Sequence, residues 1–215
     1  MYGILLYDGV EPIDIGATVG VLSMAKRIAP DLQYVTIANT PGTKNAGEVT
    51  CANGLRIVVD HNLEDAPDLA DLVVTGGPGW VGAASDQDLL GFIRDTKARL
   101  TSICTGAMIL AAAGRLAGKI VTTKHEVFAG ETPPSAMLAE CAKVDHAALV
   151  DDGEMVTGGG VTLGIDTMFY CLARSHGQDV ADQTARVMEY SRALSVNRME
   201  LGYLLNGSPT SERAA

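Results

Sequence analysis

The sequence is poor in positive charge and has no long apolar stretch. Its 215 residues include 16 lysines and arginines against 26 aspartates and glutamates, which gives a net charge of -10 at neutral pH. Such a chain repels the phosphates of nucleic acids and of anionic membranes, so neither is an expected partner. No apolar run approaches the roughly 20 residues that a membrane-spanning helix needs, so no membrane association is expected either.

Cysteine pairs and metal-ligand spacings are also missing. The four cysteines are far apart and include no C-x-x-C pair, and no two of the four histidines have metal-ligand spacing. The N-terminus, Met-Tyr-Gly-Ile-Leu-Leu-Tyr-Asp, lacks the basic start and the apolar length of a signal peptide. These absences predict a protein of the reducing cytoplasm that needs no metal and no cofactor.

No segment has the composition of a linker, and no internal repeat is visible. With 47% hydrophobic residues, a chain of this length can build one sizeable core. We expect a single domain over residues 1–196, followed by a C-terminal tail over residues 197–215. The last part of that tail, Asn206 to Ala215, is polar and contains Gly, Pro and Ser, which predicts disorder.

Short β-like runs alternate with helical patterns along the chain, which predicts an α/β fold: a mostly parallel sheet sandwiched by helices. In such folds, ligands bind at the carboxyl ends of the strands. A hairpin is expected about Asp151-Asp152-Gly153. The expected strands are Tyr2–Tyr7, Gln33–Ala38, Leu55–Asp60, Leu72–Thr75, Leu100–Ile103, Lys119–Thr122, Ala147–Val150 and Glu154–Thr157. The expected helices are Ile15–Ile28, Asp86–Ala98, Thr105–Leu116, Pro133–Ala142, Val161–Ser175 and Val180–Leu194.

The most informative segment ends an apolar run at Cys104. Ser102 and Gly106 lie two residues to either side, and the helix-prone segment Ala107–Leu116 follows. A strand that turns at once into a helix needs small neighbours and pushes the side chain at the bend outward, as in the nucleophile elbow of hydrolases. The helix N-terminus would favour the thiolate of Cys104, which predicts a low thiol pKa.

A purely structural role for Cys104 is the alternative, because unpaired cysteine is among the residue types most often buried. The other three cysteines, Cys51, Cys141 and Cys171, have no elbow-like surroundings, and we expect them to be structural. The small residues around Cys104 are what distinguish it.

Two glycine-rich loops could contribute backbone amides. Gly77 to Gly82 fits G-x-G-x-x-G after a strand, but the acidic residue that would hold a dinucleotide ribose about 20 positions later is missing. The loop could make a tight turn only, or free amides at Gly76 and Gly77 could form an oxyanion hole beside Cys104. Gly158–Gly160 is explained equally well by an anion site or by close backbone packing.

A reactive thiol needs a partner that moves protons, and the residue after Cys104 is Thr105 rather than histidine. The loop after the first strand offers carboxylates, among which Asp14 begins a helix. Asp14 could be the catalytic partner or merely an N-cap. His125 follows a strand end and could line the cleft, although such residues are often only surface groups.

Several motifs resemble those of the ThiJ/PfpI superfamily, whose members share a flavodoxin-like, class I glutamine amidotransferase-like fold. The resemblance covers residues 2 to 194. Its Cys-Thr-Gly elbow and its Pro-Ile-Asp-Ile-Gly segment are most similar to isonitrile hydratases and to the sensor domains of certain transcription regulators. The motifs that carry it are Thr-Gly-Gly-Pro-Gly, Ser-Ile-Cys-Thr-Gly-Ala, Ala-Gly-Arg-Leu-Ala-Gly-Lys, Thr-Thr and Thr-Gly-Gly-Gly-Val-Thr-Leu-Gly-Ile-Asp.

By this resemblance Cys104 is the nucleophile and Asp14 the carboxylate that contacts it or the substrate. Thr105 and the glycine-loop amides, of Gly76 and Gly77, would assist. A hydratase would attack the isocyanide carbon with the thiolate, form a thioimidate with a proton from Asp14, and release an N-substituted formamide after water attack. The resemblance also implies a small-molecule substrate and a homodimer.

The sequence departs from its relatives at several positions. Protease-like members carry histidine where this chain has Thr105, which argues against a peptidase. Hydratase-like members often have histidine after the Thr-Thr pair, where Lys124 stands, with His125 one place later. They also tend to have Pro-Pro after Glu-Tyr, whereas Tyr190 is followed by Ser-Arg, so the pocket wall is expected to differ. The residues after Leu194 are too few for the helix-turn-helix domain of the regulators.

Three functional hypotheses follow. The first is a cysteine-dependent hydratase or hydrolase of a small molecule, with isonitrile hydration as the reaction. The second is a glyoxalase or deglycase-like enzyme that acts on reactive carbonyls. The third is a redox sensor or small-ligand binding domain without turnover, since an activated thiolate oxidises easily.

Overall fold

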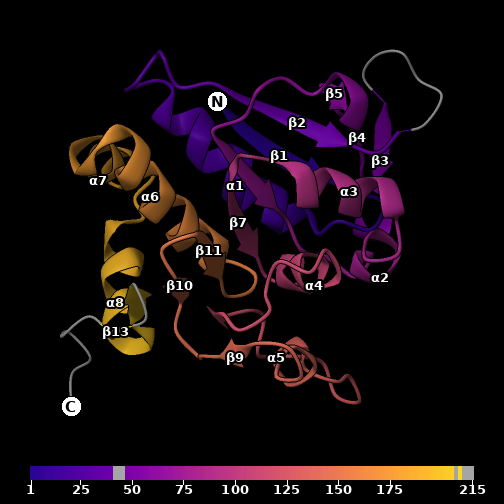
Figure 1. Ribbon diagram of the computed structural model, residues 1–215. Coiled ribbons are helices and arrows are strands. Elements are labelled where there is room, and N and C mark those ends of the chain that lie inside the picture. The colour runs from indigo at the N-terminus through magenta and orange to yellow at the C-terminus, as the bar shows by residue number, and fades with distance from the viewer. Residues whose placement is uncertain (41–46, 206–207, 210–215) are drawn as a thin grey trace.

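The structure is a computed structural model that describes residues 1–40, 47–205 and 208–209 (Figure 1). Its strands are β1 (Tyr2–Leu6), β2 (Tyr34–Ala38), β3 (Glu48–Thr50), β4 (Arg56–Val58), β5 (His61–Asn62), β6 (Asp71–Val74), β7 (Arg99–Ile103), β8 (Ile120–Val121), β9 (Lys143–Val144), β10 (Leu149–Asp151), β11 (Met155–Gly158), β12 (Tyr203–Leu205) and β13 (Ser208–Pro209). Its α-helices are α1 (Pro12–Ala25), α2 (Trp80–Ala83), α3 (Gln87–Asp95), α4 (Gly106–Ala112), α5 (Pro134–Leu138), α6 (Leu163–His176), α7 (Gln178–Val187) and α8 (Ser191–Leu201). Two short 3-10 helices cover Ala52–Gly54 and Leu63–Asp65.

Within the described residues, nine strands form one sheet in the order β13-β12-β10-β11-β7-β6-β1-β2-β5. Neighbouring strands run parallel except in the pairs β10–β11 and β12–β13, which are antiparallel. The hairpin predicted about Asp151-Asp152-Gly153 is therefore confirmed.

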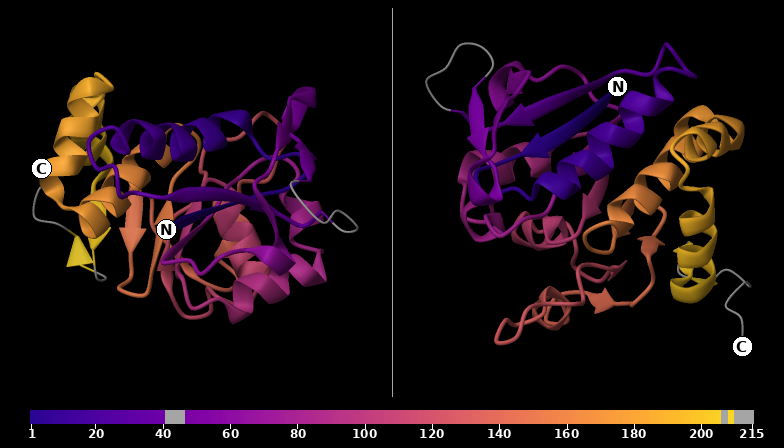
Figure 2. Two further views of the ribbon diagram at one scale, coloured as in Figure 1. Left: turned by 90° about the horizontal axis from the view of Figure 1, so that it is seen from above. Right: turned by 180° about the vertical axis from the view of Figure 1, so that it is seen from behind.

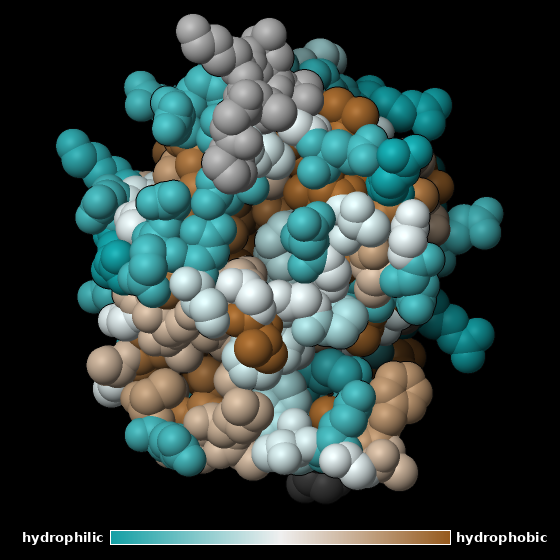
Figure 3. Space-filling view, turned by 90° about the vertical axis from the view of Figure 1, so that its right-hand side faces the viewer, coloured by the Kyte–Doolittle hydropathy of each residue, from teal (hydrophilic) through white to brown (hydrophobic). Residues whose placement is uncertain are grey.

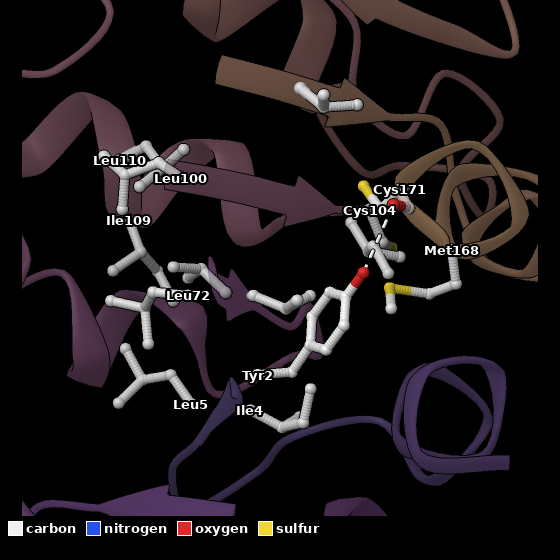
Figure 4. Close-up of a cluster of buried hydrophobic side chains, with 14 of the residues drawn as sticks. Tyr2, Ile4, Leu5, Leu72, Leu100, Cys104, Ile109, Leu110, Met168 and Cys171 are labelled. Atoms are coloured by element: carbon white, nitrogen blue, oxygen red, sulfur yellow. Dashed lines mark hydrogen bonds between the residues drawn. The ribbon is translucent and has the colours of Figure 1, made fainter. Parts of the chain in front are cut away.

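Helices cover both faces of this sheet, with α1 and α6 on one face and α3 and α4 on the other (Figure 2). Every residue of β1 and of β6 is buried, as expected for parallel strands covered on both sides. Figure 4 shows part of the resulting core, which includes Leu5, Leu72 and Leu100. In the same view, the hydroxyl of Tyr2 donates to the carbonyl oxygen of Cys171 at 3.2 Å. The predicted α/β fold with a mostly parallel, helix-covered sheet is confirmed.

Two predicted strands do not join the central sheet. Leu55–Asp60 contributes β4, which pairs with β3 in a hairpin whose Arg56 and Val58 are exposed. Lys119–Thr122 contributes β8, which pairs with β9 in a second small sheet. The amide of Thr122 donates to the side-chain oxygen of Thr157 in β11 at 2.9 Å rather than to a strand carbonyl, so the chain after β8 contacts the sheet without pairing with it.

The C-terminal part differs from the sequence-based prediction as well. The single helix expected over Val180–Leu194 is wrong, because Glu189 has a φ of +55° and separates α7 from α8. Strand β12 pairs in parallel with β10, so the sheet continues beyond residue 196, where a tail was expected. The expected disorder of Asn206–Ala215 falls mostly outside the described residues.

The carboxyl ends of four strands meet at one edge of the sheet. Strand β1 pairs with β6 up to Leu5 and Val74, and Val74 lies opposite Ser102 of β7. Ile103, the last residue of β7, lies opposite Gly158 of β11. The loops after β1, β6, β7 and β11 therefore converge, which is where an α/β fold builds its sites.

The outer surface is mixed in character. Hydrophilic and hydrophobic residues are interspersed on the face drawn in Figure 3. The most exposed large apolar side chains in the described residues are Phe128 (80%) and Val58 (65%). No helix in this part of the chain is both long and apolar enough to cross a membrane.

Candidate active site

Cys104 occupies the sharp turn between β7 and α4. Its φ is +57°, a left-handed conformation that residues other than glycine rarely adopt. The backbone around it is tightly held: its amide approaches the carbonyl oxygens of Gly158 at 3.2 Å and Gly159 at 3.1 Å. Its own carbonyl oxygen accepts a hydrogen bond from Thr123 Oγ1 at 2.8 Å. Strain of this kind persists only where the surroundings fix it, and it is common at functional sites.

The small residues beside the cysteine are required by close backbone packing. A Cβ atom on Gly106 would lie 2.1 Å from the carbonyl oxygen of Val74, so any larger residue would force β6 and α4 apart. Ser102 is completely buried on the other side of the turn. Small residues two positions to either side of Cys104 are therefore needed because the backbone packs closely at this turn, as the sequence suggested.

Asp14 lies beside this turn, in the first turn of α1. It is completely buried, and its Oδ2 accepts a hydrogen bond from the amide of Gly76 at 2.8 Å. A Cβ on Gly76 would lie 2.7 Å from both Asp14 Oδ2 and Cys104 Cβ, so this glycine allows the two side chains to meet. The N-cap alternative for Asp14 is wrong, because α1 begins at Pro12 and its N-cap is Glu11.

The carboxyl of Asp14 has a pKa well above that of an ordinary aspartate. Burial raises the pKa of its carboxyl from 3.8 to about 7, and nearby Glu11 raises it as well. The Gly76 amide, Lys124 and the Cys104 thiol lower this pKa, but burial outweighs them. Asp14 Oδ1 is buried without a hydrogen-bond partner among the described residues. A carboxyl with this pKa and an open oxygen can both accept and donate a proton at neutral pH.

The thiol itself is not the activated thiolate that the helix N-terminus predicted. Cys104 is 3% exposed, and burial followed by the charge of Asp14 raises the pKa of its thiol from 9.0 to about 12. The backbone amide of Thr105 and the charge of Lys124 lower this pKa, but by less. The expectation of a low pKa is therefore wrong, because burial and the charge of Asp14 outweigh the Thr105 amide and the charge of Lys124.

Thr105 and the glycine loop hold each other. The amide of Gly77 donates to Thr105 Oγ1 at 2.8 Å, and this hydroxyl in turn donates to the carbonyl oxygen of Gly77 at 3.2 Å. Because the amide of Gly76 is bound to Asp14, neither glycine amide is a free donor. This geometry corrects the expectation of an oxyanion hole at Gly76 and Gly77: the two amides position Asp14 and Thr105 instead.

The glycine-rich loop also packs against the chain rather than opening a phosphate site. Gly77 has a φ of +151°, and a Cβ there would lie 2.4 Å from the amide nitrogen of Glu11. The amide of Gly79 donates to the carbonyl oxygen of Gly9 at 3.0 Å. The loop after β6 is therefore locked to the loop after β1, which brings Asp14 to the elbow.

His125 is engaged elsewhere. Its Nε2 lies 3.1 Å from Thr122 Oγ1, and its ring stacks on His146 with centroids 4.0 Å apart. Burial lowers the pKa of its imidazole. None of its hydrogen bonds or ring contacts within the described residues reaches Cys104.

Lys124 and Tyr7 are the neighbours that sequence reasoning missed. A Cβ on Gly160 would lie 2.8 Å from Lys124 Cβ and 3.1 Å from Cys104 Sγ, so the lysine stem and the thiol flank one glycine. The Tyr7 hydroxyl donates to the carbonyl oxygen of Thr75 at 3.1 Å, and burial, Asp14 and Cys104 all raise its pKa. The available signals were the position of Lys124 after the Thr-Thr pair and that of Tyr7 at the end of the first strand.

The other cysteines take no part in this turn, and Cys104 lines neither of two cavities, although Tyr7 lines the smaller one. All four cysteines are unpaired, and Cys141 is the exposed one. Two cavities of about 180 and 340 Å³ are lined by other residues than Cys104, the larger one by α6, α7, α8 and β12. In the described part of the chain, no group of three or more histidine, cysteine, aspartate or glutamate side chains could hold a metal ion.

Comparison with known proteins places these residues in a family. The DJ-1/PfpI family model matches residues 3–174. An isonitrile hydratase of Pseudomonas putida is 32% identical over 89% of this chain and 78% of its own length. The transcriptional regulator GbdR of Pseudomonas aeruginosa is 25% identical over 88% of this chain, and the chain spans about half of that regulator's length (50%).

Solved structures agree with the fold. A ThiJ/PfpI family protein from Pseudomonas syringae is 27% identical with a TM-score of 0.70, over 88% of this chain and 74% of that one. DJ-1beta of Drosophila melanogaster superposes with a TM-score of 0.72 over 88% of this chain and 97% of its own, and at 18% identity it shows the fold alone. The family model, the similarity to the hydratase over most of both chains and the shared fold together show that the chain belongs to the DJ-1/PfpI family.

Proposed function

We propose that the protein is a cysteine-dependent hydratase of a small molecule and that it converts an isonitrile into an N-substituted formamide. The observation that carries this proposal is the pairing at one strained turn of a buried thiol, Cys104, with a carboxyl that titrates near pH 7, Asp14. The 32% identity to an isonitrile hydratase over most of both chains supports the choice of reaction.

In the first step, the sulfur of Cys104 forms a bond to the terminal isonitrile carbon. The thiol proton passes to Asp14, whose Oδ1 has no other partner among the described residues, and from there to the same carbon. The product is a thioimidate, in which carbon carries sulfur and hydrogen and is doubly bonded to nitrogen. The backbone amide of Thr105 lowers the pKa of the thiol, so it would stabilise the negative charge that develops on the sulfur when the thiol gives up its proton.

In the second step, water adds to the thioimidate carbon. Asp14 takes one proton from this water and passes it to the nitrogen. The carbon–sulfur bond then breaks as the new hydroxyl becomes the formamide carbonyl, and the hydroxyl proton passes through Asp14 to the sulfur and restores the thiol. One carboxyl then serves as base in both steps and as acid between them, which a pKa of about 7 permits near neutral pH.

The other two hypotheses have less support. A redox sensor needs a thiol that ionises easily, whereas burial and Asp14 raise the pKa of Cys104. An enzyme acting on reactive carbonyls would use the same pair of residues, so assays must separate it from the hydratase. Thr105 stands where protease-like relatives carry histidine, which argues against a peptidase. A homodimer remains part of the proposal, and exposed apolar residues of α7 and α8, Val187 (48%) and Met199 (53%), offer a surface for it.

The test is an assay of the purified protein with an alkyl isocyanide and, separately, with methylglyoxal. We expect formamide from the isocyanide, detected by NMR, and a loss of at least about a hundredfold in kcat for Cys104→Ala and for Asp14→Asn. Cys141→Ala is the matched control, because that thiol is exposed and outside the site, and it should keep full activity. Turnover of methylglyoxal alone, or undiminished formamide production by Asp14→Asn, would refute the proposal.

A further inference from the structure

Lys124 is fixed beside the thiol by the two threonines before it. The amide of Thr122 donates to Thr157 Oγ1 at 2.9 Å, and Thr123 Oγ1 donates to the carbonyl oxygen of Cys104 at 2.8 Å. Both threonines are completely buried, so the segment that carries Lys124 is bonded directly to the elbow. The backbone of Lys124 therefore keeps its position relative to the sulfur.

A glycine allows the lysine side chain to come close. A Cβ on Gly160 would lie 2.8 Å and 2.9 Å from Cβ and Cγ of Lys124 and 3.1 Å from Cys104 Sγ. The aliphatic stem and the sulfur thus touch the same small residue from two sides. The ammonium acts on both reactive groups, since its charge lowers the pKa of Cys104 and of Asp14.

This ammonium has no partner of its own. Lys124 is half-buried, and within residues 1–40, 47–205 and 208–209 its ammonium makes no ion pair or hydrogen bond. Lys119, in contrast, is bound by Asp152 at 3.1 Å and by Glu154 at 2.6 Å. A cation without a partner beside the thiol is available to bind a ligand group of opposite charge.

The acidic groups that face Lys124 do not cancel its charge fully. Asp14 interacts with the charge of Lys124, but burial raises the pKa of Asp14 to about 7, and its Oδ2 is bound by the Gly76 amide. Glu11 is partly exposed, and its charge acts on Asp14 by raising the pKa of that carboxyl. Although the whole chain carries a charge of -10, a cation is therefore present beside the thiol, and its charge acts on Cys104 and Asp14.

We propose that Lys124 determines specificity at this site and selects substrates that carry a negatively charged group, such as a carboxylate, next to the carbon that Cys104 attacks. The selection of anionic isonitriles as substrates rests on the proposed hydratase function. The preference of the thiol site for negatively charged reagents does not, so the charge preference and the hydratase function can each be refuted separately.

The first test compares two alkylating agents that differ only in charge. Iodoacetate and iodoacetamide both form a bond from the cysteine sulfur to a CH₂ carbon, with iodide as the leaving group and the thiol proton released. Labelling of Cys104 is followed by peptide mass spectrometry in a Cys141→Ala background, because the exposed thiol would consume reagent. The ratio of iodoacetate to iodoacetamide rates is the readout.

We expect this ratio to fall about tenfold in Lys124→Met and to be kept in Lys124→Arg, since a nearby ammonium favours the anionic reagent. The wild-type ratio should also fall when salt is raised from about 0.05 to about 1 M, as screening weakens the attraction. Equal ratios in the wild type and Lys124→Met would overturn the proposal, and so would a Cys104 that neither reagent reaches.

The second test uses isocyanoacetate and its methyl ester as substrates. Loss of the Lys124 charge also raises the pKa of Cys104 and Asp14, which changes the rate for both compounds alike, so the readout is the ratio of kcat/KM for the anion to kcat/KM for the ester. Lys124→Met should lower this ratio about tenfold, mainly through a higher KM for the anion, whereas a merely structural lysine would leave the ratio unchanged. Turnover of both compounds without this fall in the ratio overturns the specificity role and leaves the hydratase intact. No turnover of either compound, together with a charge-dependent labelling ratio, would refute the hydratase alone.

Discussion

Replacement of Asp14 by asparagine should change how stability depends on pH. In the unfolded chain the carboxyl ionises with a pKa of 3.8, and in the folded chain burial raises this pKa to about 7. Between these values the folded state holds a proton that the unfolded state lacks, so stability falls as pH rises. The favourable contribution is complete below about pH 4 and is lost as pH passes through about 7.

The size of this effect follows from the shift. Each pKa unit corresponds to about 1.4 kcal/mol, so a shift from 3.8 to about 7 amounts to about 4 kcal/mol. Because Asp14 is completely buried, solvent screening does not reduce this figure much. In Asp14→Asn, the new amide side chain would keep an oxygen acceptor for the amide of Gly76 but could not ionise. Relative to the wild type, Asp14→Asn should therefore gain about 1.4 kcal/mol for each pH unit from 4 to 7, and the difference should level off above pH 7.

The assay is urea unfolding, followed by circular dichroism, at pH 4.5, 5.5, 6.5 and 7.5. The readout is the free energy of unfolding of the variant minus that of the wild type, so that other titrating groups cancel. Asp31→Asn is the matched control, since Asp31 is exposed, and it should keep the pH dependence of the wild type. Parallel stability curves for Asp14→Asn and the wild type would show that Asp14 is ionised in the folded state, and the proton-transfer role would lose its basis.

Two further substitutions probe the packing that positions the site. Gly106→Ala should lower the free energy of unfolding by about 2–3 kcal/mol, measured by chemical denaturation, because its methyl would lie 2.1 Å from the Val74 carbonyl oxygen. Gly82→Ala is the control, since a Cβ there meets nothing within 4 Å, and equal losses in both variants would contradict the packing argument. Tyr190→Phe removes a 2.8 Å hydrogen bond to the buried Asp166 and should cost about 1–3 kcal/mol, with faster amide hydrogen exchange in α8. Unchanged exchange in α8 would mean that this bond does not hold the helix.

The elements around the site could be predicted because each has a strong local cause. Buried parallel strands are continuous apolar runs, which located β1, β6 and β7 to within two residues. Small residues at positions 102 and 106 located the turn at Cys104, because the backbone of β6 leaves no room for more. The two strands that were misplaced in the sheet, β4 and β8, are short, and nothing in their own residues fixes the partner strand.

Protonation states and donor availability could not be predicted in the same way. Helix position alone favours a thiolate at Cys104, whereas its pKa depends on burial and on a carboxyl far away in the sequence. The same holds for Gly76 and Gly77, whose amides are bound by Asp14 and Thr105. Lys124 follows the Thr-Thr pair in the sequence, but its closeness to the sulfur depends on Gly160, which belongs to another loop.

A protonated thiol suits the proposed reaction better than a preformed thiolate would. In isonitrile hydration the nucleophile and a proton are added to the same carbon, so both are needed at one place and in close succession. The buried pair of Cys104 and Asp14 stores that proton inside the site, since burial raises the pKa of both groups. A thiolate exposed at a helix end would already have lost its proton to water and would be open to oxidation. In the proposed reaction, the burial that raises these pKa values would thus keep nucleophile and proton together until the isonitrile carbon binds.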